Sequence, residues 1–271
     1  LYNLSDDQTE YQINDRMSFM RFLGINLCEK VPDAKTIWKF KNDLAETKTV
    51  NTLFCMFDEY LEKEGLISHK GTIVDATFVD APRQRNSRDE NKKIKNGEIP
   101  EEWEKPENKS KLAQKDIDAD WTKKNGERHF GYKDHVKCDA DSKLITNYSV
   151  TSASVHDSQR CLVFIGQEDE VLYADSAYSG KPIALALPEN CKNQICEKGY
   201  RNSPLTSEQK MNNRRKSRIR CRIEHIFGFM TGAMHGITIR SIGITRAWMN
   251  IGITNLVYNF CRYSYLKRAS A

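Results

Sequence analysis

Three acidic residues of this 271-residue chain stand in surroundings that are otherwise apolar. Asp75 lies within the β-branched stretch 72–79, Asp175 follows the apolar stretch 171–174, and Glu224 lies beside an apolar helical stripe. Three ionised carboxylates that converged would repel one another unless cations neutralised them. Oxygen ligands suit Mg²⁺ or Mn²⁺, and two such ions support phosphoryl transfer. We therefore predict that Asp75, Asp175 and Glu224 are catalytic and bind two Mg²⁺ or Mn²⁺ ions.

Each acid taken alone has a simpler interpretation. Asp75 could be a structural aspartate that accepts hydrogen bonds, and Glu224 could form a helix salt bridge with Arg220 four residues earlier. Taken together, and next to a basic helix, the three acids favour a metal-dependent enzyme that acts on nucleic acid.

Positive charge is concentrated in one segment of the chain. Residues 192–222 contain 10 basic and 2 acidic side chains, whereas the whole chain has a net charge of +5. A basic block of this kind indicates a polyanionic partner, nucleic acid first, although a solvated helix face is the alternative. We predict a row of phosphate-binding arginines at helical spacing, Arg214, Arg218 and Arg222. The full set of expected DNA-binding residues is Arg214, Arg215, Arg218, Arg220 and Arg222.

Residues 1–66 have the apolar spacing of helices with short connections. One helix is expected after Asn14 or Asp15, a second from Pro32-Asp33, and a third that ends near Gly65. The second could read DNA, or it could be an ordinary packing helix. We interpret residues 1–66 as a small helical domain that is truncated at its start, because the first residue is Leu1. Its expected role is DNA-end binding or dimerisation.

The pattern changes to strands at about residue 71. A polar insertion at about 83–128 is expected to stay outside the sheet, and to be mobile, because it has few apolar residues. The order of elements predicts an α/β (α+β layered) domain over 67–271, with a mixed sheet flanked by helices in a ribonuclease-H-like arrangement. The expected strands are 72–79, 130–139, 144–151, 171–175 and one near 194–197. The expected helices start after Val155 and cover 207–230 and 245–265.

A few side chains near these elements have weaker signals. His156 follows a strand and could assist substrate positioning or proton transfer, although a structural histidine is equally consistent with the sequence. Asp80 is interpreted as a loop or turn residue. Trp103 and Trp121 could stack on an unpaired base, but local packing is the more common role of such residues.

Several short motifs occur in an order that resembles the DDE transposases of bacterial insertion sequences, specifically the insertion-sequence-5 group. The stretch 15–24 is similar to the helical leader of that family. The other motifs are Ile73-Val74-Asp75-Ala76-Thr77-Phe78, Gly131-Tyr132-Lys133-Asp134-His135, Val155-His156-Asp157-Ser158, Tyr173-Ala174-Asp175-Ser176 and Arg222-Ile223-Glu224-His225.

The resemblance implies a ribonuclease-H-like catalytic domain in which Asp75, Asp175 and Glu224 are the metal-binding triad. It implies a transposase that hydrolyses a phosphodiester at the end of an insertion sequence and then transfers the strand. Expected partners are double-stranded DNA, as terminal inverted repeats and as target, and a second copy in the active complex. A decayed DNA-binding relative and a ribonuclease-H-type nuclease are the alternatives.

The resemblance is incomplete around the third acid. The broader signature there is Tyr-x2-Arg-x3-Glu-x6-Lys, and Arg220 stands at its Arg position. Ser217 replaces the Tyr and Thr231 replaces the Lys. Other basic residues of the segment could substitute as phosphate ligands.

The composition excludes several classes of protein. No apolar run is long enough to span a membrane, and the N-terminus has no signal-peptide pattern, so we expect no membrane partner and a bacterial cytoplasmic location. The eight cysteines have no C-x-x-C spacing, which favours reduced, packed thiols over a zinc site or a disulfide framework.

Overall fold

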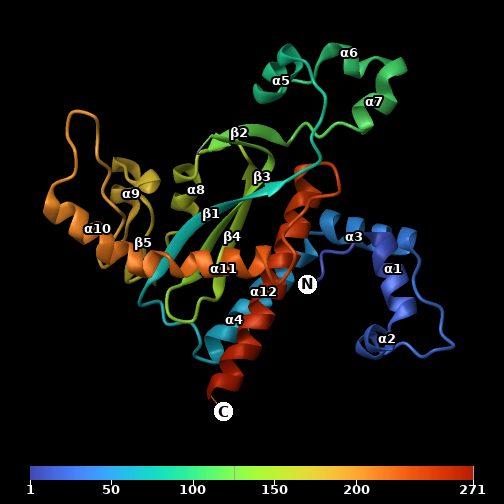
Figure 1. The fold of residues 1–271 in the computed structure, drawn as a ribbon, viewed down its shortest axis with the longest axis horizontal. Coiled ribbons are helices and arrows are strands. Elements are labelled where there is room, and N and C mark those ends of the chain that lie inside the picture. The colour runs from blue at the N-terminus through green and yellow to red at the C-terminus, as the bar shows by residue number, and fades with distance from the viewer. Residues whose placement is uncertain (125, 271) are drawn as a thin grey trace.

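The computed structural model describes residues 1–124 and 126–270, and Figure 1 shows it as a ribbon. Asn125, inside the predicted insertion, and Ala271 lie outside the described residues. The fold is a mixed sheet with helices on both faces, preceded by helices at the N-terminus, as the sequence predicts. The strands are β1 (Thr72–Asp80), β2 (Asp120–Lys124), β3 (Glu127–Asp139), β4 (Ile145–Ser152), β5 (Val171–Tyr173) and β6 (Lys192–Asn193).

The sheet has the order β2-β3-β1-β5-β6, and β4 also pairs with β3. Strands β1, β3 and β4 are antiparallel neighbours, whereas β5 and β6 run parallel to β1. Close approach of β1 and β3 requires glycine at position 131, where φ is +146° and an added Cβ would lie 2.3 Å from the Val79 carbonyl oxygen. The sheet is therefore mixed, and its parallel part carries β1 and β5 side by side.

Successive residues of β1 point to opposite faces of the sheet and enter two different cores. Ile73 and Val79 pack with α11 (Arg222–Thr231), α12 (Ile244–Ser270) and α4 (Thr49–Lys63). Val74 packs with α8 (Ser158–Phe164) and α9 (Lys181–Ala186) on the other face. Asp75 shares the parity of Ile73, so its side chain belongs to the face that α11 covers.

The N-terminal helices are α1 (Asp6–Asp15), α2 (Met17–Leu23), α3 (Ala34–Glu46) and α4. Helix α1 was not expected. Helix α3 starts as predicted, because the Asp33 side chain accepts a hydrogen bond from the Thr36 N–H at 2.7 Å. Helices α1 and α2 share a small core of their own, whereas Phe54 of α4 enters the main core beside the sheet.

The prediction that residues 83–128 stay outside the sheet was wrong at their C-terminal end. Strand β2 pairs with β3 over its whole length, and Trp121 packs against Phe130 with ring centroids 5.1 Å apart. An edge strand tolerates the polar side chains that argued against a strand here. The rest of the insertion forms α5 (Arg88–Lys95), α6 (Glu101–Glu104), a short 3₁₀ helix and α7 (Lys109–Ala113), which Figure 1 shows as a group beyond β2. Trp103 is completely buried inside this group, where its indole N–H donates to Glu90 at 2.8 Å.

The helix expected over 207–230 is two helices, α10 (Ser207–Arg220) and α11. Cys221 has a ψ of −10°, and the Glu224 N–H bonds to its carbonyl three residues back, so the helix tightens there instead of continuing. Two smaller predictions also change. Asp80 is the last residue of β1 and not a loop residue, and the strand expected near 194–197 is β6 at Lys192–Asn193.

No helix of the described residues combines the length and the apolar character that crossing a bilayer requires.

Candidate active site

Asp75 occupies the middle of β1, on the face that α11 covers. Its Oδ1 accepts a hydrogen bond from the Ala76 N–H at 2.8 Å, and its Oδ2 accepts one from Nη1 of Arg220 at 2.9 Å. Only 15 % of the side chain is exposed. Burial, with a smaller contribution from the negative charge of Asp175, raises the pKa of Asp75 to about 6 against the opposing effects of these two contacts.

Asp175 follows the end of β5, next to Asp75. Thr72 and Ile73 of β1 lie opposite Leu172 and Tyr173 of β5, so the same offset puts Asp175 level with Asp75. The side chain of Asp175 caps a short 3₁₀ helix (Ser176–Tyr178), and its Oδ1 accepts a hydrogen bond from the Ala177 N–H at 2.7 Å. This cap fixes one carboxylate oxygen at the end of the parallel strands, where open α/β sheets present their ligand sites.

Glu224 lies in the first turn of α11, and 58 % of its side chain is exposed. Its Oε1 accepts a hydrogen bond from Nη2 of Arg220 at 2.9 Å. The salt bridge that the sequence offered as the simpler interpretation of Glu224 is therefore present. The same guanidinium also contacts Asp75, so Arg220 brings two of the three predicted acids together.

The donor set at this place fits a divalent cation of the magnesium class. Asp75, Asp175 and Glu224 offer only carboxylate oxygens, which are the ligands that Mg²⁺ and Mn²⁺ prefer. A positively charged guanidinium already lies between two of them, as expected where acids need a counterion. Asp75 and Asp175 are held by backbone N–H groups, whereas Glu224 is exposed and can adjust its position.

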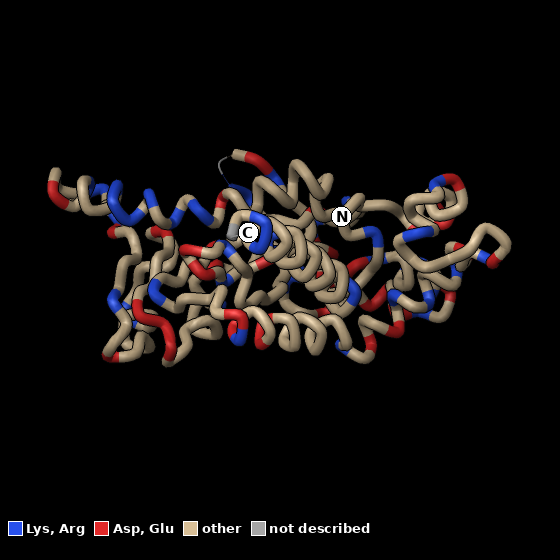
Figure 2. The backbone as a smooth tube through the Cα atoms, turned by 90° about the horizontal axis from the view of Figure 1, so that it is seen from below, with Lys and Arg blue, Asp and Glu red and all other residues tan. Residues whose placement is uncertain are grey.

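Helix α10 presents a basic surface that leads toward the acids. Lys and Arg recur along it in Figure 2, where it forms the arm on the left. Lys210, Arg214 and Arg218 follow one another at four-residue spacing and line a shallow hollow that also reaches Cys221. Arg214, Arg215 and Arg218 are exposed. This part of the predicted set is therefore accessible to a phosphate backbone.

Arg222 does not extend this row as the sequence suggested. Its Nη1 donates to the Ala140 carbonyl at 2.8 Å and to Asp141 Oδ1 at 3.0 Å. These contacts fasten the start of α11 to the turn between β3 and β4. Arg220, too, is directed to the acids. The inclusion of Arg222 in the predicted row was wrong, because that row assumed one continuous helix over 207–230.

His156 makes local contacts in the turn before α8. Its Nδ1 lies 2.8 Å from the Ser158 hydroxyl, and the Ser158 N–H approaches the same nitrogen at 3.3 Å. The ring is otherwise exposed. These contacts match the structural interpretation of His156, and an auxiliary role remains a prediction.

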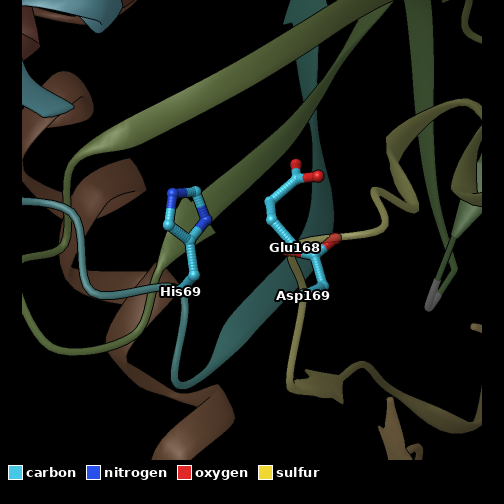
Figure 3. A group of neighbouring side chains, drawn as sticks. All are labelled: His69, Glu168 and Asp169. Carbon is cyan, nitrogen blue, oxygen red and sulfur yellow. The ribbon is translucent and has the colours of Figure 1, made fainter. Parts of the chain in front are cut away.

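A second group of possible metal ligands was not foreseen, since its members stand in polar stretches, where acidic residues and histidines are common. Ligand atoms of His69, Glu168 and Asp169 lie within 4.8 Å of one another (Figure 3). Asp169 already accepts hydrogen bonds from the Thr72 hydroxyl at 2.6 Å and from Nζ of Lys137 at 2.9 Å. The same ammonium lies 3.5 Å from Glu168. The group precedes β1 and β5, whereas Asp175 follows β5. Asp169 is buried, His69 is half-buried and Glu168 is exposed, and we interpret the group as an ion-pair network around Lys137.

Comparisons with known families decide the classification of the chain. The family described as "Transposase DDE domain" matches residues 67–260, which is more than half of the chain and includes all three acids. The chain belongs to the DDE transposase family. A second family, described as "Transposase domain (DUF772)", matches residues 1–43 of this transposase. No solved structure matched the chain. Divalent metal ions and DNA are the cofactor class and the substrate that the family implies for this transposase.

Proposed function

We propose that this protein is a cut-and-paste DNA transposase that cleaves the ends of an insertion sequence and joins them to target DNA. In the first step, water hydrolyses the phosphodiester at the end of the element and frees a 3′-OH. In the second step, that hydroxyl attacks a phosphodiester of the target in line. Both steps have an oxygen that enters and an oxygen that leaves, so one site can perform them.

The observation that supports this proposal is that Asp75 and Glu224, from a strand and a helix, share one guanidinium. Asp175 follows β5, the parallel neighbour of the strand that carries Asp75, and its charge acts on Asp75. We propose that these three carboxylates hold two Mg²⁺ or Mn²⁺ ions. Such ions, when bound, supply Lewis-acid activation of the attacking oxygen and charge stabilisation of the leaving oxygen.

The residues of the chain itself would bind and orient the DNA and hold the acids in place. The N–H groups of Ala76 and Ala177 fix one oxygen each of Asp75 and Asp175. The exposed arginines of α10 would bind phosphates of the DNA backbone and position the scissile bond near the acids. We further propose that the helices of residues 1–66 bind the inverted repeats, that two copies act together, and that the reaction occurs in the bacterial cytoplasm.

The test is a cleavage assay on three substrates with the full chain. These are a duplex that carries the inverted repeats flanking its gene, a random duplex, and an RNA–DNA hybrid, each with Mg²⁺, with Mn²⁺ and with chelator. We expect metal-dependent cleavage at the repeat boundary that leaves a 3′-OH, followed by joined products when target DNA is added. Cleavage of the hybrid alone would identify a ribonuclease-H-type nuclease, and binding of the repeats without cleavage by any metal would identify a DNA-binding relative.

A further inference from the structure

Arg220 lies where two of the proposed metal ligands meet. It is the last residue of α10, and its two terminal nitrogens bond to different acids, Nη1 to Asp75 and Nη2 to Glu224, each at 2.9 Å. Charge-assisted contacts of this kind are among the stronger hydrogen bonds in proteins. The guanidinium therefore acts as the counterion of this pair of acids.

The guanidinium and a divalent cation would compete for the same oxygens. A Mg²⁺–oxygen bond is about 2.1 Å long, so a cation on Asp75 Oδ2 or Glu224 Oε1 would lie at most about 5 Å from a nitrogen of Arg220 that kept its present contact. Two positive groups at that separation repel each other strongly in a partly buried site. Arg220 must therefore move for Asp75 and Glu224 to share a cation at full affinity.

A phosphate is the natural alternative partner for Arg220. Residues on both sides of it in the sequence, Arg218 and Cys221, line the basic hollow of α10, so a DNA backbone bound there would pass close to it. Guanidinium groups form two parallel hydrogen bonds to phosphate as readily as to carboxylate. The helix also tightens at Cys221, so Arg220 lies directly before the junction of α10 and α11.

We propose that Arg220 closes the acid pair in the DNA-free protein and is transferred to a DNA phosphate when substrate binds, which couples metal loading to the arrival of DNA. This inference rests on the proposed function, because it assumes that Asp75 and Glu224 bind metal. Arg220 is a positioning residue in this scheme. The free protein would then hold metal weakly and would not cleave until DNA occupies the hollow of α10.

The experiment measures Mn²⁺ affinity of the full chain by electron paramagnetic resonance of free Mn²⁺, with and without a short duplex of the inverted repeat. The variants are Arg220→Gln, which removes the charge, and Arg220→Lys, which keeps it. Arg218→Gln is the matched control, because it removes the same charge from the same helix and leaves the acids untouched. Asp75→Asn and the double variant Arg220→Gln with Asp75→Asn report whether the ion binds at this site.

Without DNA, we expect Arg220→Gln to bind Mn²⁺ at least about tenfold more tightly than the parent, Arg220→Lys to lie between them, and Arg218→Gln to match the parent. Duplex DNA should tighten Mn²⁺ binding to the parent and have a smaller effect on Arg220→Gln. Thermal unfolding gives a second measurement, in which Mn²⁺ should raise the melting temperature of Arg220→Gln more than that of the parent.

The outcomes separate the two proposals. If Mn²⁺ binding depends on Asp75 but is equal or weaker in Arg220→Gln, the coupling through Arg220 is refuted and the metal centre stands. If the double variant binds Mn²⁺ as tightly as Arg220→Gln, or if Asp75→Asn does not weaken binding by the parent in the presence of the duplex, the metal centre itself is refuted. Equal gains in Arg218→Gln and Arg220→Gln would show a general charge effect and would also refute the coupling.

Discussion

Replacement of Asp75 by asparagine should stabilise the protein at neutral pH, although it removes a proposed metal ligand. Asp75 sits in a strand between apolar neighbours, and its burial raises its pKa from the ordinary value of 3.8 to about 6. The ionised form is therefore less favourable in the folded protein than in the unfolded chain. Asparagine has nearly the same shape and can still accept the hydrogen bond of the Ala76 N–H.

The sign of the effect follows from proton binding. Between about pH 4 and pH 6 the folded state keeps a proton that the unfolded state has lost, so stability is greatest below pH 4 and falls as the pH rises through 6. A difference of about two pKa units between the folded and unfolded states lowers the free energy of unfolding by about 3 kcal/mol at pH 8, relative to low pH. At pH 5, where Asp75 of the folded state has only begun to titrate, the loss is about 1.5 kcal/mol. This net shift already includes the favourable contact with Arg220.

The assay is chemical denaturation of parent and Asp75→Asn at pH 5 and pH 8, without divalent ions. We expect the variant to be more stable at both values, with a gain that grows by about 1.5 kcal/mol between them. Asp80→Asn is the control, because 69 % of the Asp80 side chain is exposed and its replacement should change the free energy of unfolding by less than about 0.5 kcal/mol. A variant that is less stable than the parent at pH 8, or a gain that does not change with pH, would refute the reasoning.

Three further predictions concern other parts of the molecule. Burial and the neighbouring Glu62 raise the pKa of Asp58 to about 7, so stability should fall as the pH rises through 7, and Asp58→Asn should raise the melting temperature more at pH 8 than at pH 5. Trp103→Ala should cost the α5–α7 group about 3–5 kcal/mol, which amide exchange would detect as lost protection over 88–113 with β1 unchanged. Arg214→Ala and Arg218→Ala should each reduce, by about one, the steepness with which the logarithm of the DNA-binding constant falls with the logarithm of the salt concentration. The reduction should be the same on specific and random duplexes, and unchanged slopes would place the DNA elsewhere.

Strands β1, β3, β4 and β5 could be predicted from the sequence, and Asp75 and Asp175 could be singled out, because each has a local signal. A carboxylate in a β-branched run, as at Asp75, or directly after one, as at Asp175, is recognisable without knowledge of what packs against it. Helix α3 could likewise be placed from its cap at Asp33.

The sequence could not predict features that depend on contacts between distant segments. Strand β2 is polar and is held in the sheet by its pairing with β3. Its low content of apolar residues, taken alone, predicted a loop. The break at Cys221 has no glycine or proline to announce it. The direction of Arg222 depends on Asp141, which lies 81 residues earlier. Helical spacing placed Arg222 in a DNA-binding row because that spacing contains no information about partners across the fold.

The most direct test of the central claim compares cleavage and binding of repeat-end DNA by Asp75→Asn, Asp175→Asn and Glu224→Gln. Asp80→Asn serves as the control, because this exposed acid has no proposed role in the reaction. With Mg²⁺, we expect each of the three acid variants to lose at least about a hundredfold in cleavage while it binds DNA as tightly as the parent, or more tightly because repulsion of phosphate is relieved. An acid variant that cleaves within a few-fold of the parent would contradict the three-acid metal site.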